Sequence, residues 1–402
     1  MPVTESLEEL ACLAAEAVSR RRLLNETYRF ISVPSPTGGE AAFAALFRDT
    51  LSELGLESFL DVEFADSPSV IGRLRGTGGG PTLQLDGHTD TVPVPHEPPS
   101  VDFERDLVRG RGAADMKGGL AAICEAIRAL GVAGVRPRGD VLVTAHGLHE
   151  APLGDQRTLR SLLARKVVGE AAIIAELGHA NLATRSRGMS IYTISVRRDG
   201  PSMHEVEWTR RDAQPIEGVR LLLNALTARA EELTAEPAHF EERETLFVGE
   251  VRSGDFYNRV PTHAVIVGTR RYRAPLTKSD VMAEFEELCN NVAERTGLSL
   301  DVDLKEVGPA YALDPSEPVI AAVQASYRDV VGGELPLAPA QAVGNAADFA
   351  AFGVPAVYHG VNQRTAHSDD EHVSGAELER AARVIAGSIV HFCGADHDKE
   401  KR

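Results

Sequence analysis

The stretch LQLDGHTDTVP, residues 83–93, decides how this chain folds. An apolar run typical of a buried strand ends here and presents His88 and Asp90, two residues apart. In open α/β sheets, ligands bind at the carboxyl ends of the strands. A lone histidine at such a position is more often structural. The His-x-Asp spacing, however, places a carboxylate close enough to orient a metal-binding imidazole.

Helical and strand patterns alternate on both sides of this stretch through residue 186. This alternation predicts an α/β domain with a mostly parallel sheet and helices on both faces. Residues 1–22 predict an opening amphipathic helix, because apolar residues recur at helical spacing between charges. Further helices are expected near 41–55, 117–130, 317–331 and 374–393, and strands near 82–86, 140–145 and 171–176.

The pattern changes after Arg187. Half-exposed strands such as MSIYTISVRR alternate with helices near 216–230 and 279–296, which indicates a separate α+β unit. The α/β pattern returns near residue 307. We therefore expect one catalytic domain, 1–186 and 307–402, interrupted by an inserted lid domain, 187–306.

Composition excludes several classes of protein. The 402 residues carry 59 acidic and 42 basic side chains, a net charge of −17 that opposes binding to nucleic acid or an anionic membrane. Four cysteines without a CxxC pair argue against a disulfide framework or a thiolate zinc site. No signal peptide or long apolar run is recognisable, so a cytoplasmic protein is expected. The GTGGGP turn, 76–81, lacks the lysine of a nucleotide-binding loop.

Four more polar residues stand where other elements begin or end. Asp115 precedes a helix in GRGAADMKGG, Glu150 and Glu176 each follow a strand, and His367 follows the apolar segment VPAVYHG. Taken singly, each is explained as a helix cap or a loop residue. Together with His88 they form a set of oxygen and imidazole groups at one edge of the sheet, as a pair of divalent metal ions requires.

The motifs DGHTDTVP, GRGAADMKGG and AHSDDEHV, in this order with the acidic strand ends between them, resemble those of the M20 metallopeptidase family. That family includes acetylornithine deacetylase, succinyl-diaminopimelate desuccinylase and carboxypeptidase G2. The resemblance covers nearly the whole chain. It implies a catalytic α/β domain interrupted by a lid domain, which usually also forms a homodimer interface.

By this resemblance, Asp115 bridges two metal ions, and His88 and Glu176 complete one site. Glu150 and His367 complete the other. A ligand set without thiolates suits Zn²⁺, Co²⁺ or Mn²⁺, with zinc the first choice. Asp90 joins the catalytic set through its action on the ring of His88. A cis peptide bond is also implied after Asp115.

The chain departs from the family at His149. The usual pair here is two glutamates, a general base followed by a metal ligand, but this chain has His149 and Glu150. Three interpretations stay open: His149 is the base, it is an extra metal ligand or substrate-binding group, or it marks a member that lost hydrolysis. A neutral imidazole beside two cations should also have a depressed pKa. The neighbouring His146 is expected to be a buried core histidine.

Further residues of the lid correspond to the family's substrate contacts. His204 in RDGPSMHEVEW matches a histidine that polarises the scissile carbonyl, although it also fits an exposed loop residue. Asn258, and Arg271 in preference to Arg270 or Arg273, match groups that bind a substrate carboxylate. Gly344 begins a segment that leads to an active-site aspartate, here Asp348.

Together these features predict a two-metal hydrolase of an amide-like C–N bond, of deacylase, peptidase or aminohydrolase type. Its substrate is expected to be a small molecule that carries a carboxylate. The alternative is a non-catalytic protein of the same fold that binds a metal ion or small ligand in the cleft.

Overall fold

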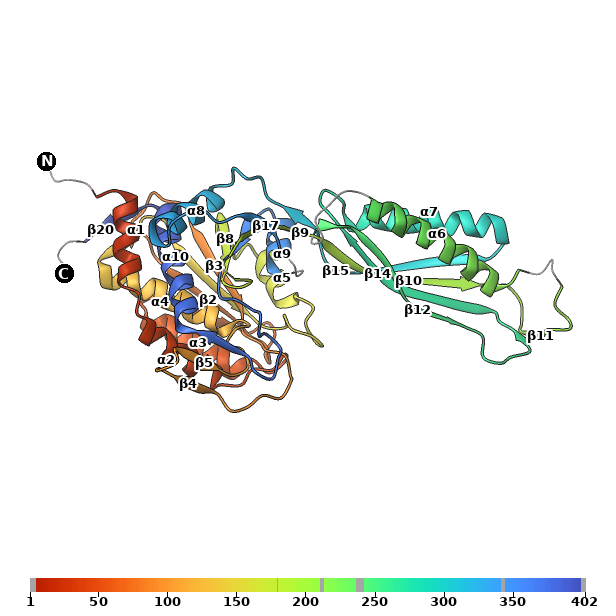
Figure 1. The fold of residues 1–402 in the computed structure, drawn as a ribbon, viewed down its shortest axis with the longest axis horizontal. Coiled ribbons are helices and arrows are strands. Elements are labelled where there is room, and N and C mark those ends of the chain that lie inside the picture. The colour runs from red at the N-terminus through yellow and green to blue at the C-terminus, as the bar shows by residue number, and fades with distance from the viewer. Residues whose placement is uncertain (1–4, 179, 210–212, 236–241, 341–343, 399–402) are drawn as a thin grey trace. The chain divides into compact units, whose positions relative to one another are not determined.

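The computed structural model describes residues 5–178, 180–209, 213–235, 242–340 and 344–398. The chain forms two compact units (Figure 1). The discontinuous unit comprises Met1–Thr184, Leu313–Ala338 and Asp348–Arg402, and the inserted unit comprises Arg185–Ala312 with Pro339–Ala347. The second inserted segment was expected in the other domain. The Ala340 amide of this segment donates a hydrogen bond to the Arg185 carbonyl (2.7 Å).

The discontinuous unit is built on a large mixed sheet, and the predicted α/β class is confirmed. The four central strands are parallel, and antiparallel strands flank them on both edges. In spatial order the strands are β1 (Glu57–Asp61), β2 (Ser69–Leu74), β7 (Val141–His146), β3 (Leu83–His88), β8 (Ala171–Ile174), β18 (Ala356–Tyr358) and β9 (Leu182–Ser186), with the short β16 (Tyr311–Ala312) and β17 (Leu337–Pro339) paired to β9. Strand β16 and the last residues of β9 and β17 fall within the segments of the inserted unit.

The central strands β7, β8 and β18 are mainly apolar because both of their faces are covered. In β3 the buried polar residues Gln84 and Asp86 are hydrogen-bonded to Thr144 of β7. Every residue of β3 and β7 is buried. Leu83 pairs with both Val141 and Ala171, so the three strands start level with one another. Their carboxyl ends consequently open at the same edge of the sheet.

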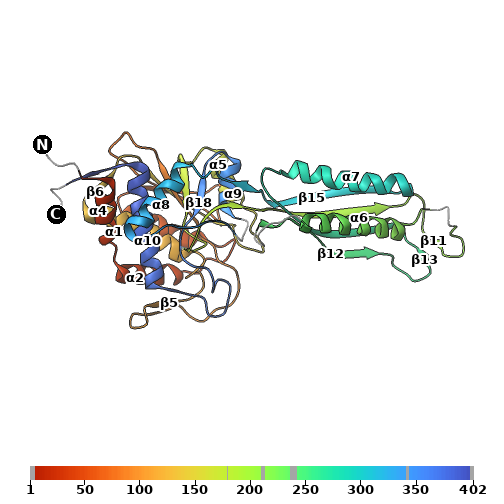
Figure 2. The same ribbon diagram turned by 45° about the horizontal axis from the view of Figure 1, so that its top comes forward.

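Helices cover this sheet on both faces. One large apolar cluster joins the helices α1, α2, α3, α4, α8 and α10 to the sheet, and α1, α8 and α10 pack together (Figure 2). On the other face Leu162 of α5 packs on Ile71 and Leu142. The helices of this unit are α1 (Leu7–Glu16), α2 (Arg20–Ile31), α3 (Ala41–Glu53), α4 (Lys117–Ala133), α5 (Arg157–Ala164), α8 (Pro318–Val330) and α10 (Gly375–Cys393). Helix α9 (Asn345–Ala351) begins in the inserted unit and continues into this one at Asp348.

The amino terminus contains two helices where one was expected. The first ends at Glu16, and the side chain of Ser19 caps the second by accepting a hydrogen bond from the Arg22 amide. Serine competes for backbone hydrogen bonds and favours such a cap over a helix interior. Within the described residues, no helix is long and apolar enough to cross a membrane.

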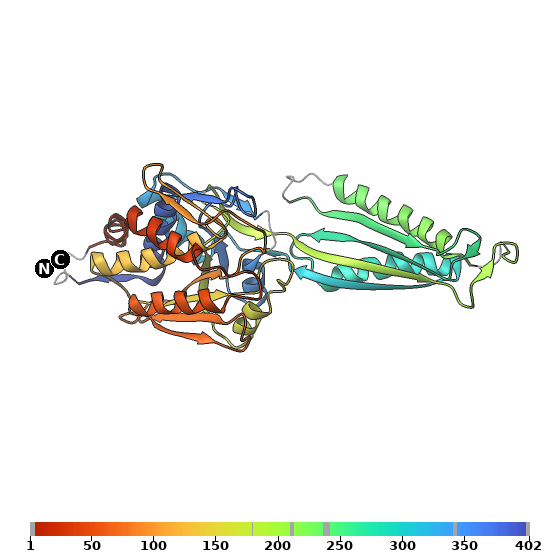
Figure 3. The same ribbon diagram turned by 90° about the horizontal axis from the view of Figure 1, so that it is seen from below.

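The inserted unit is an antiparallel sheet with two helices on one side. Figure 3 looks onto the side of this sheet that faces away from the helices. Buried residues alternate with half-exposed ones along β10 and β14, as the sequence pattern predicted. The sheet order is β12 (Thr245–Ser253), β14 (His263–Tyr272), β10 (Gly188–Arg197) and β15 (Ser299–Gly308), and the helices are α6 (Pro215–Ala235) and α7 (Lys278–Thr296).

Three small sheets complete the two units. One has three strands, β4 (Ser100–Asp102), β5 (Leu107–Arg109) and β19 (His372–Ser374). The other two are strand pairs: β6 (Val135–Pro137) with β20 (Ala395–His397), and β11 (Met203–His204) with β13 (Arg259–Val260).

Candidate metal centre

Five predicted ligands converge at the carboxyl edge of the central strands. His88 is the last residue of β3, while Glu150 and Glu176 follow β7 and β8. Asp115 lies just before α4, and His367 lies in the loop after β18. The level register of the strands brings these segments together although they are far apart in the sequence.

Asp115 lies between two groups of ligands. Its Oδ1 atom is 3.0 Å from His88 Nε2, and its Oδ2 atom is 3.2 Å from His367 Nε2. Beyond them, Glu176 Oε2 lies 3.9 Å from His88 Nε2, and Glu150 Oε1 lies 3.1 Å from His367 Nε2. We call these the His88 half-site and the His367 half-site. Each oxygen of Asp115 faces one of them.

The donor set and its spacing fit divalent metal ions. Atoms that bind one cation at about 2.1 Å are separated from each other by about 3.0–3.4 Å. Most of the separations in the two half-sites lie close to this range. Imidazole and carboxylate ligands without thiolates suit Zn²⁺, Co²⁺ or Mn²⁺.

Close packing of three backbones around Ala175 builds the centre. A Cβ atom on Gly119 of α4 would lie 2.0 Å from the Ala175 carbonyl oxygen. A Cβ atom on Gly360, after β18, would lie 2.1 Å from the same oxygen. These glycines allow the start of α4 and the loop of His367 to approach Glu176. Larger residues would push the half-sites apart.

A buried carboxylate fixes the backbone of the bridging residue. Glu371 Oε1 accepts hydrogen bonds from the amides of Gly112, Ala114 and Asp115 at 3.0, 3.0 and 3.1 Å. Its Oε2 atom accepts from Arg111 Nη1 at 2.7 Å. The peptide bond between Asp115 and Met116 is cis, as the family resemblance implied.

Asp90 has two contacts with different purposes. Its backbone carbonyl lies 2.9 Å from His88 Nδ1, closer than its carboxylate oxygen at 3.5 Å. The other carboxylate oxygen accepts hydrogen bonds from the amides of His149 and Glu150 at 3.0 and 2.7 Å. Asp90 thus fixes the tautomer of His88, with Nε2 toward Asp115, and anchors the loop that carries Glu150.

Electrostatics favour a cation at the centre. Burial raises the pKa of both Glu150 and Glu176 to about 7, and the nearby charge of Asp115 adds to the effect. Burial opposes protonation of His88, yet its hydrogen bonds to Asp115 and Asp90 raise the pKa well above 6.5. Without a metal ion, the raised pKa values therefore favour protons on the same side chains that are predicted to bind the cations.

His149 lies face to face with His88. The two imidazole rings are 4.1 Å apart and 1° from parallel. A metal ion lies in the plane of each imidazole that binds it, about 2.1 Å from the nitrogen. An ion in the plane of one stacked ring is therefore too far from the plane of the other. Ligand atoms of His88, His149 and Glu176 lie within 4.8 Å of one another, but with the rings stacked His149 is not placed to bind an ion that lies in the plane of the His88 ring.

Burial, followed by the charge of His88, lowers the pKa of His149 to about 3. The depressed pKa expected from the sequence is found, but burial rather than a neighbouring cation is its leading cause. His146 is fully buried, as expected, with Nε2 3.4 Å from Asp86 Oδ2.

Three residues of the centre were not identified from the sequence. The Gln363 amide nitrogen lies 2.7 Å from Asp115 Oδ1 and 3.1 Å from Glu176 Oε2. Glu40 Oε1 accepts a hydrogen bond from the Leu148 amide (3.0 Å) and so supports the loop of His149. Glu371 stood inside the AHSDDEHV motif and could have been singled out. Gln363 and Glu40 carry no signal of their own in a single sequence.

The remaining predicted residues lie in the inserted unit. His204 and Asn258 meet where β11 pairs with β13, with His204 Nε2 3.1 Å from the Asn258 amide nitrogen. Arg271 lies on β14 and is half-buried, whereas its neighbour Arg270 is fully buried between Glu244 and Glu284. Gly344 is buried just before α9.

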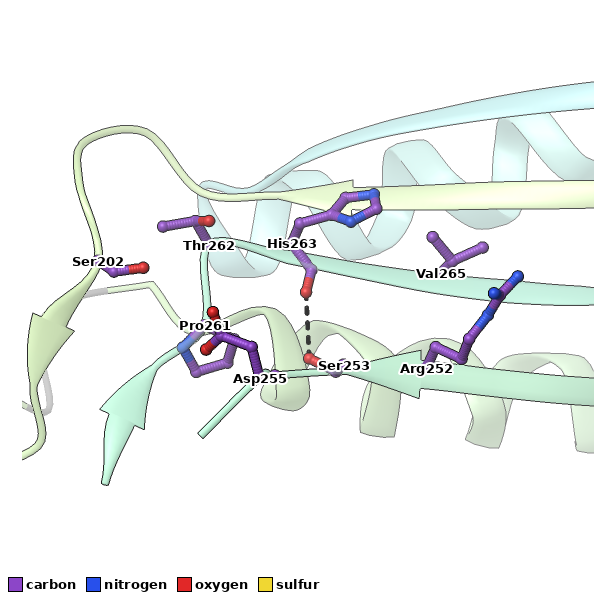
Figure 4. Close-up of a pocket in the computed structure, with 9 residues that line it drawn as sticks. Ser202, Arg252, Ser253, Asp255, Pro261, Thr262, His263 and Val265 are labelled. Carbon is purple, nitrogen blue, oxygen red and sulfur yellow. Dashed lines mark hydrogen bonds between the residues drawn. The ribbon is translucent and has the colours of Figure 1, made fainter. Parts of the chain in front are cut away.

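The inserted unit also has a hollow of about 410 Å³, which neither His204 nor Asn258 lines. Ser202 and Thr262 line one end of it, and Arg252 and Val265 line the other (Figure 4). Ser253 Oγ donates a hydrogen bond to the His263 carbonyl (3.2 Å), drawn as a dashed line in Figure 4. The hollow is lined by the end of β12, the start of β14 and the loops beside them.

The family model for peptidase family M20/M25/M40 matches residues 84–391. The chain belongs to this family. It is 27% identical over 333 residues to succinyl-diaminopimelate desuccinylase of Alkalilimnicola ehrlichii, covering 78% of this chain and 85% of that protein. It is 24% identical over 379 residues to N-formyl-4-amino-5-aminomethyl-2-methylpyrimidine deformylase of Bacillus subtilis, covering 85% and 87%.

Solved structures show the same M20 fold. The aminopeptidase PepT of Bacillus cereus superposes with a TM-score of 0.77 at 20% identity, covering 94% of this chain and 99% of that one. The YXEP protein of Bacillus subtilis, described as a dinuclear metal-binding M20 peptidase, superposes with a TM-score of 0.68 at 17% identity, covering 92% and 97%. The desuccinylase, deformylase and peptidase names all denote hydrolysis of C–N bonds.

Proposed function

We propose that this M20 protein is a hydrolase of an amide-like C–N bond that uses two divalent metal ions. The observation that carries the proposal is the position of Asp115, whose two oxygens face two separate sets of ligands. A carboxylate shared in this way is typical of two-metal hydrolases. Zinc is the first candidate, followed by cobalt and manganese.

Two bound cations would supply Lewis acidity toward the scissile carbonyl and lower the pKa of the attacking water. The protein's own residues hold the ligands in place and move the proton. Asp90 fixes Nε2 of His88 toward Asp115, while Glu371 fixes the backbone of Asp115. A preorganised arrangement of this kind loses little free energy to reorganisation during the reaction.

His149 is proposed as the group that accepts the proton of the attacking water. It takes the place of the usual glutamate, directly before the ligand Glu150, and its stacking excludes it as a ligand alongside His88. The Gln156 amide nitrogen lies 2.8 Å from His149 Nδ1, and in this orientation Gln156 Oε1 is buried without a hydrogen-bond partner. Rotating the amide would let Oε1 accept from Nδ1–H. His149 Nε2 would then carry the lone pair that a base requires.

Amine or ammonia release, measured by mass spectrometry, tests the activity. The substrates would be pooled N-acyl amino acids, dipeptides and amino-substituted aromatic acids, offered to protein loaded with Zn²⁺, Co²⁺ or Mn²⁺. A product that forms only with metal would support the hydrolase. His149→Ala is expected to lower the turnover rate by about 10²–10⁴-fold with metal still bound, the usual contribution of a general base. A change of only a few-fold would remove His149 from that role.

The alternative function is a binding protein of the M20 fold that has lost hydrolysis, and the replacement of the usual glutamate by His149 favours it. Metal-loaded protein that yields no product, while a pooled ligand raises its melting temperature, would support this alternative. His149→Glu restores the family's pair of acids and provides the matched variant. Activity gained only in His149→Glu would show that the histidine ended catalysis.

A small substrate with a carboxylate is proposed from the inserted unit. His204 and Asn258 are hydrogen-bonded to each other and present an imidazole and an amide on one surface. His204 is assigned to the scissile carbonyl, and Asn258, Arg271 and Gly344 to the rest of the substrate. Asn258→Ala is expected to raise KM at least tenfold for a carboxylate substrate, with little change for its amide analogue.

A homodimer through the inserted unit is also proposed. The sheet ends in the edge strand β12, where Phe247 and Val251 are 62% and 45% exposed. Sedimentation velocity would show a dimer that Phe247→Lys converts to monomer. A cytoplasmic location is proposed because none of the four cysteines forms a disulfide.

A further inference from the structure

We propose that Gln363 is a sixth protein ligand of the metal centre, and that its side-chain carbonyl oxygen binds the cation of the His88 half-site. This inference rests on the proposed two-metal centre. It adds a residue that is not among the five predicted ligands, and it assigns different coordination to the two cations.

The position of Gln363 is the first support. Its amide end lies 2.7 Å from Asp115 Oδ1 and 3.1 Å from Glu176 Oε2, the two carboxylate oxygens of the His88 half-site. His88 Nε2 lies 3.0 Å from the same oxygen of Asp115. Atoms that bind one cation are spaced about 3.0–3.4 Å apart. The amide of Gln363 thus lies at the distance of a ligand, where an outer hydrogen-bonding group would be farther from the cation.

The chemistry of the amide decides which atom faces the cation. Without a cation, the NH₂ group donates to two carboxylates and is favoured there. A bound cation engages those carboxylate oxygens and repels the positively polarised NH₂ hydrogens. A rotation of 180° about the last side-chain bond replaces nitrogen with oxygen at almost no steric cost. Amide carbonyl oxygens are established ligands of divalent ions.

The loop backbone holds Gln363 for this role. The Ala366 amide donates a hydrogen bond to the Gln363 carbonyl (3.0 Å), which closes a turn between Gln363 and His367. Gly360 permits the loop to approach the backbone of Ala175, next to Glu176. One short loop therefore delivers a residue to each half-site, His367 to one and Gln363 to the other.

The consequence is a functional difference between the two cations. The His88 half-site would have His88, Asp115, Glu176 and Gln363, which completes four protein ligands. The His367 half-site would have Asp115, Glu150 and His367, which leaves it one protein ligand fewer. Structural metal sites are closed by four protein ligands, and catalytic sites retain an open position. Substrate is then expected to bind at the cation of the His367 half-site.

The test is a titration of metal-free full-length protein with Co²⁺, followed by calorimetry and by visible absorption of the bound ion. Gln363→Leu removes the polar atoms at similar size, Gln363→Glu retains an oxygen ligand, and Asn362→Ala is the control from the same loop. Two Co²⁺ ions are expected to bind wild-type protein. Gln363→Leu should weaken one of them at least tenfold and change the visible spectrum of that ion, because an amide oxygen is removed from its coordination sphere. Gln363→Glu should restore the affinity.

Several outcomes would overturn the proposal. Affinity and spectrum of Gln363→Leu that match those of Asn362→Ala would show that Gln363 is not a ligand. Weaker binding with an unchanged spectrum would assign Gln363 as a hydrogen-bond donor to the carboxylates. If Gln363→Leu fails to fold, failure of Gln363→Glu to bind Co²⁺ as tightly as wild type would refute the ligand. Wild-type protein that binds no metal would instead refute the proposed function.

Discussion

Replacing Glu371 by alanine should destabilise the discontinuous unit strongly. Its side chain is fully buried, and its carboxylate accepts hydrogen bonds from three backbone amides and from Arg111. A hydrogen bond to a charged group contributes about 1.5–3 kcal/mol, so three amides give an upper range of about 4.5–9 kcal/mol. The three share one oxygen, and water entering the cavity would replace part of the loss. Breaking a buried ion pair costs about 3–5 kcal/mol. We expect a loss of about 4 kcal/mol.

Differential scanning calorimetry of metal-free protein measures this loss. At about 2–4 °C per kcal/mol, the melting temperature should fall by roughly 8–16 °C. Asp369→Ala, an exposed acidic residue of the same loop, is the matched control and should change stability by less than about 0.5 kcal/mol. The single tryptophan, Trp208, lies in the inserted unit, and its fluorescence follows that unit separately. A Glu371→Ala loss no larger than that of Asp369→Ala would refute the argument.

Three further predictions concern both units. Arg270→Ala should destabilise the inserted unit by about 3–5 kcal/mol by Trp208 fluorescence, since Arg270 is fully buried between Glu244 (2.7 Å) and Glu284 (3.0 Å); an effect below 1 kcal/mol would contradict this. Burial raises the pKa of Cys289 to about 11 from 9.0, so at pH 8 its thiolate should be about 100-fold scarcer than that of an exposed thiol. Its alkylation rate should therefore rise about tenfold per pH unit toward 11, and a plateau near pH 9 would count against burial as the cause. A chelator should lower the melting temperature of protein purified with metal, reversibly on adding Zn²⁺, because ions at 100 times their Kd stabilise by about 2.7 kcal/mol; an unchanged value would argue against binding.

Elements with strong periodicity were predicted closely. The helices expected near 279–296 and 374–393 are found at Lys278–Thr296 and Gly375–Cys393, where a Thr277 or Ser374 cap marks the start. The buried strands β3 and β7 were found as short, mainly apolar segments bounded by turn residues. The edge strand β1 and its neighbour β2 were not, because β1 is largely exposed and neither strand has the clear apolar pattern of a buried strand.

The residues of the metal centre that belong to recognisable motifs were predicted from the sequence, whereas the orientation of their side chains was not. His88, Asp115, Glu150, Glu176 and His367 were chosen from strand ends and from the family resemblance, and the structure brings all five together. The stacking of His149 on His88 could not be predicted, because it depends on how the loop after β7 folds back over β3. Side-chain orientation of this kind is set by tertiary packing, which leaves no local pattern.

The discontinuity of the larger unit has a consequence during synthesis on the ribosome. Helix α10 packs against α1, α4 and α8, so its apolar face is needed to complete the core that begins with the first helix. The apolar surface that α10 covers therefore stays exposed on the nascent amino-terminal segment while Arg185–Ala312 is translated. Translation of this segment takes roughly 6–25 s at about 5–20 residues per second. The inserted segment has most of its partners within itself and can fold in that interval. Chaperones are therefore expected to bind a nascent chain whose inserted segment is folded while the core of its amino-terminal segment is still incomplete.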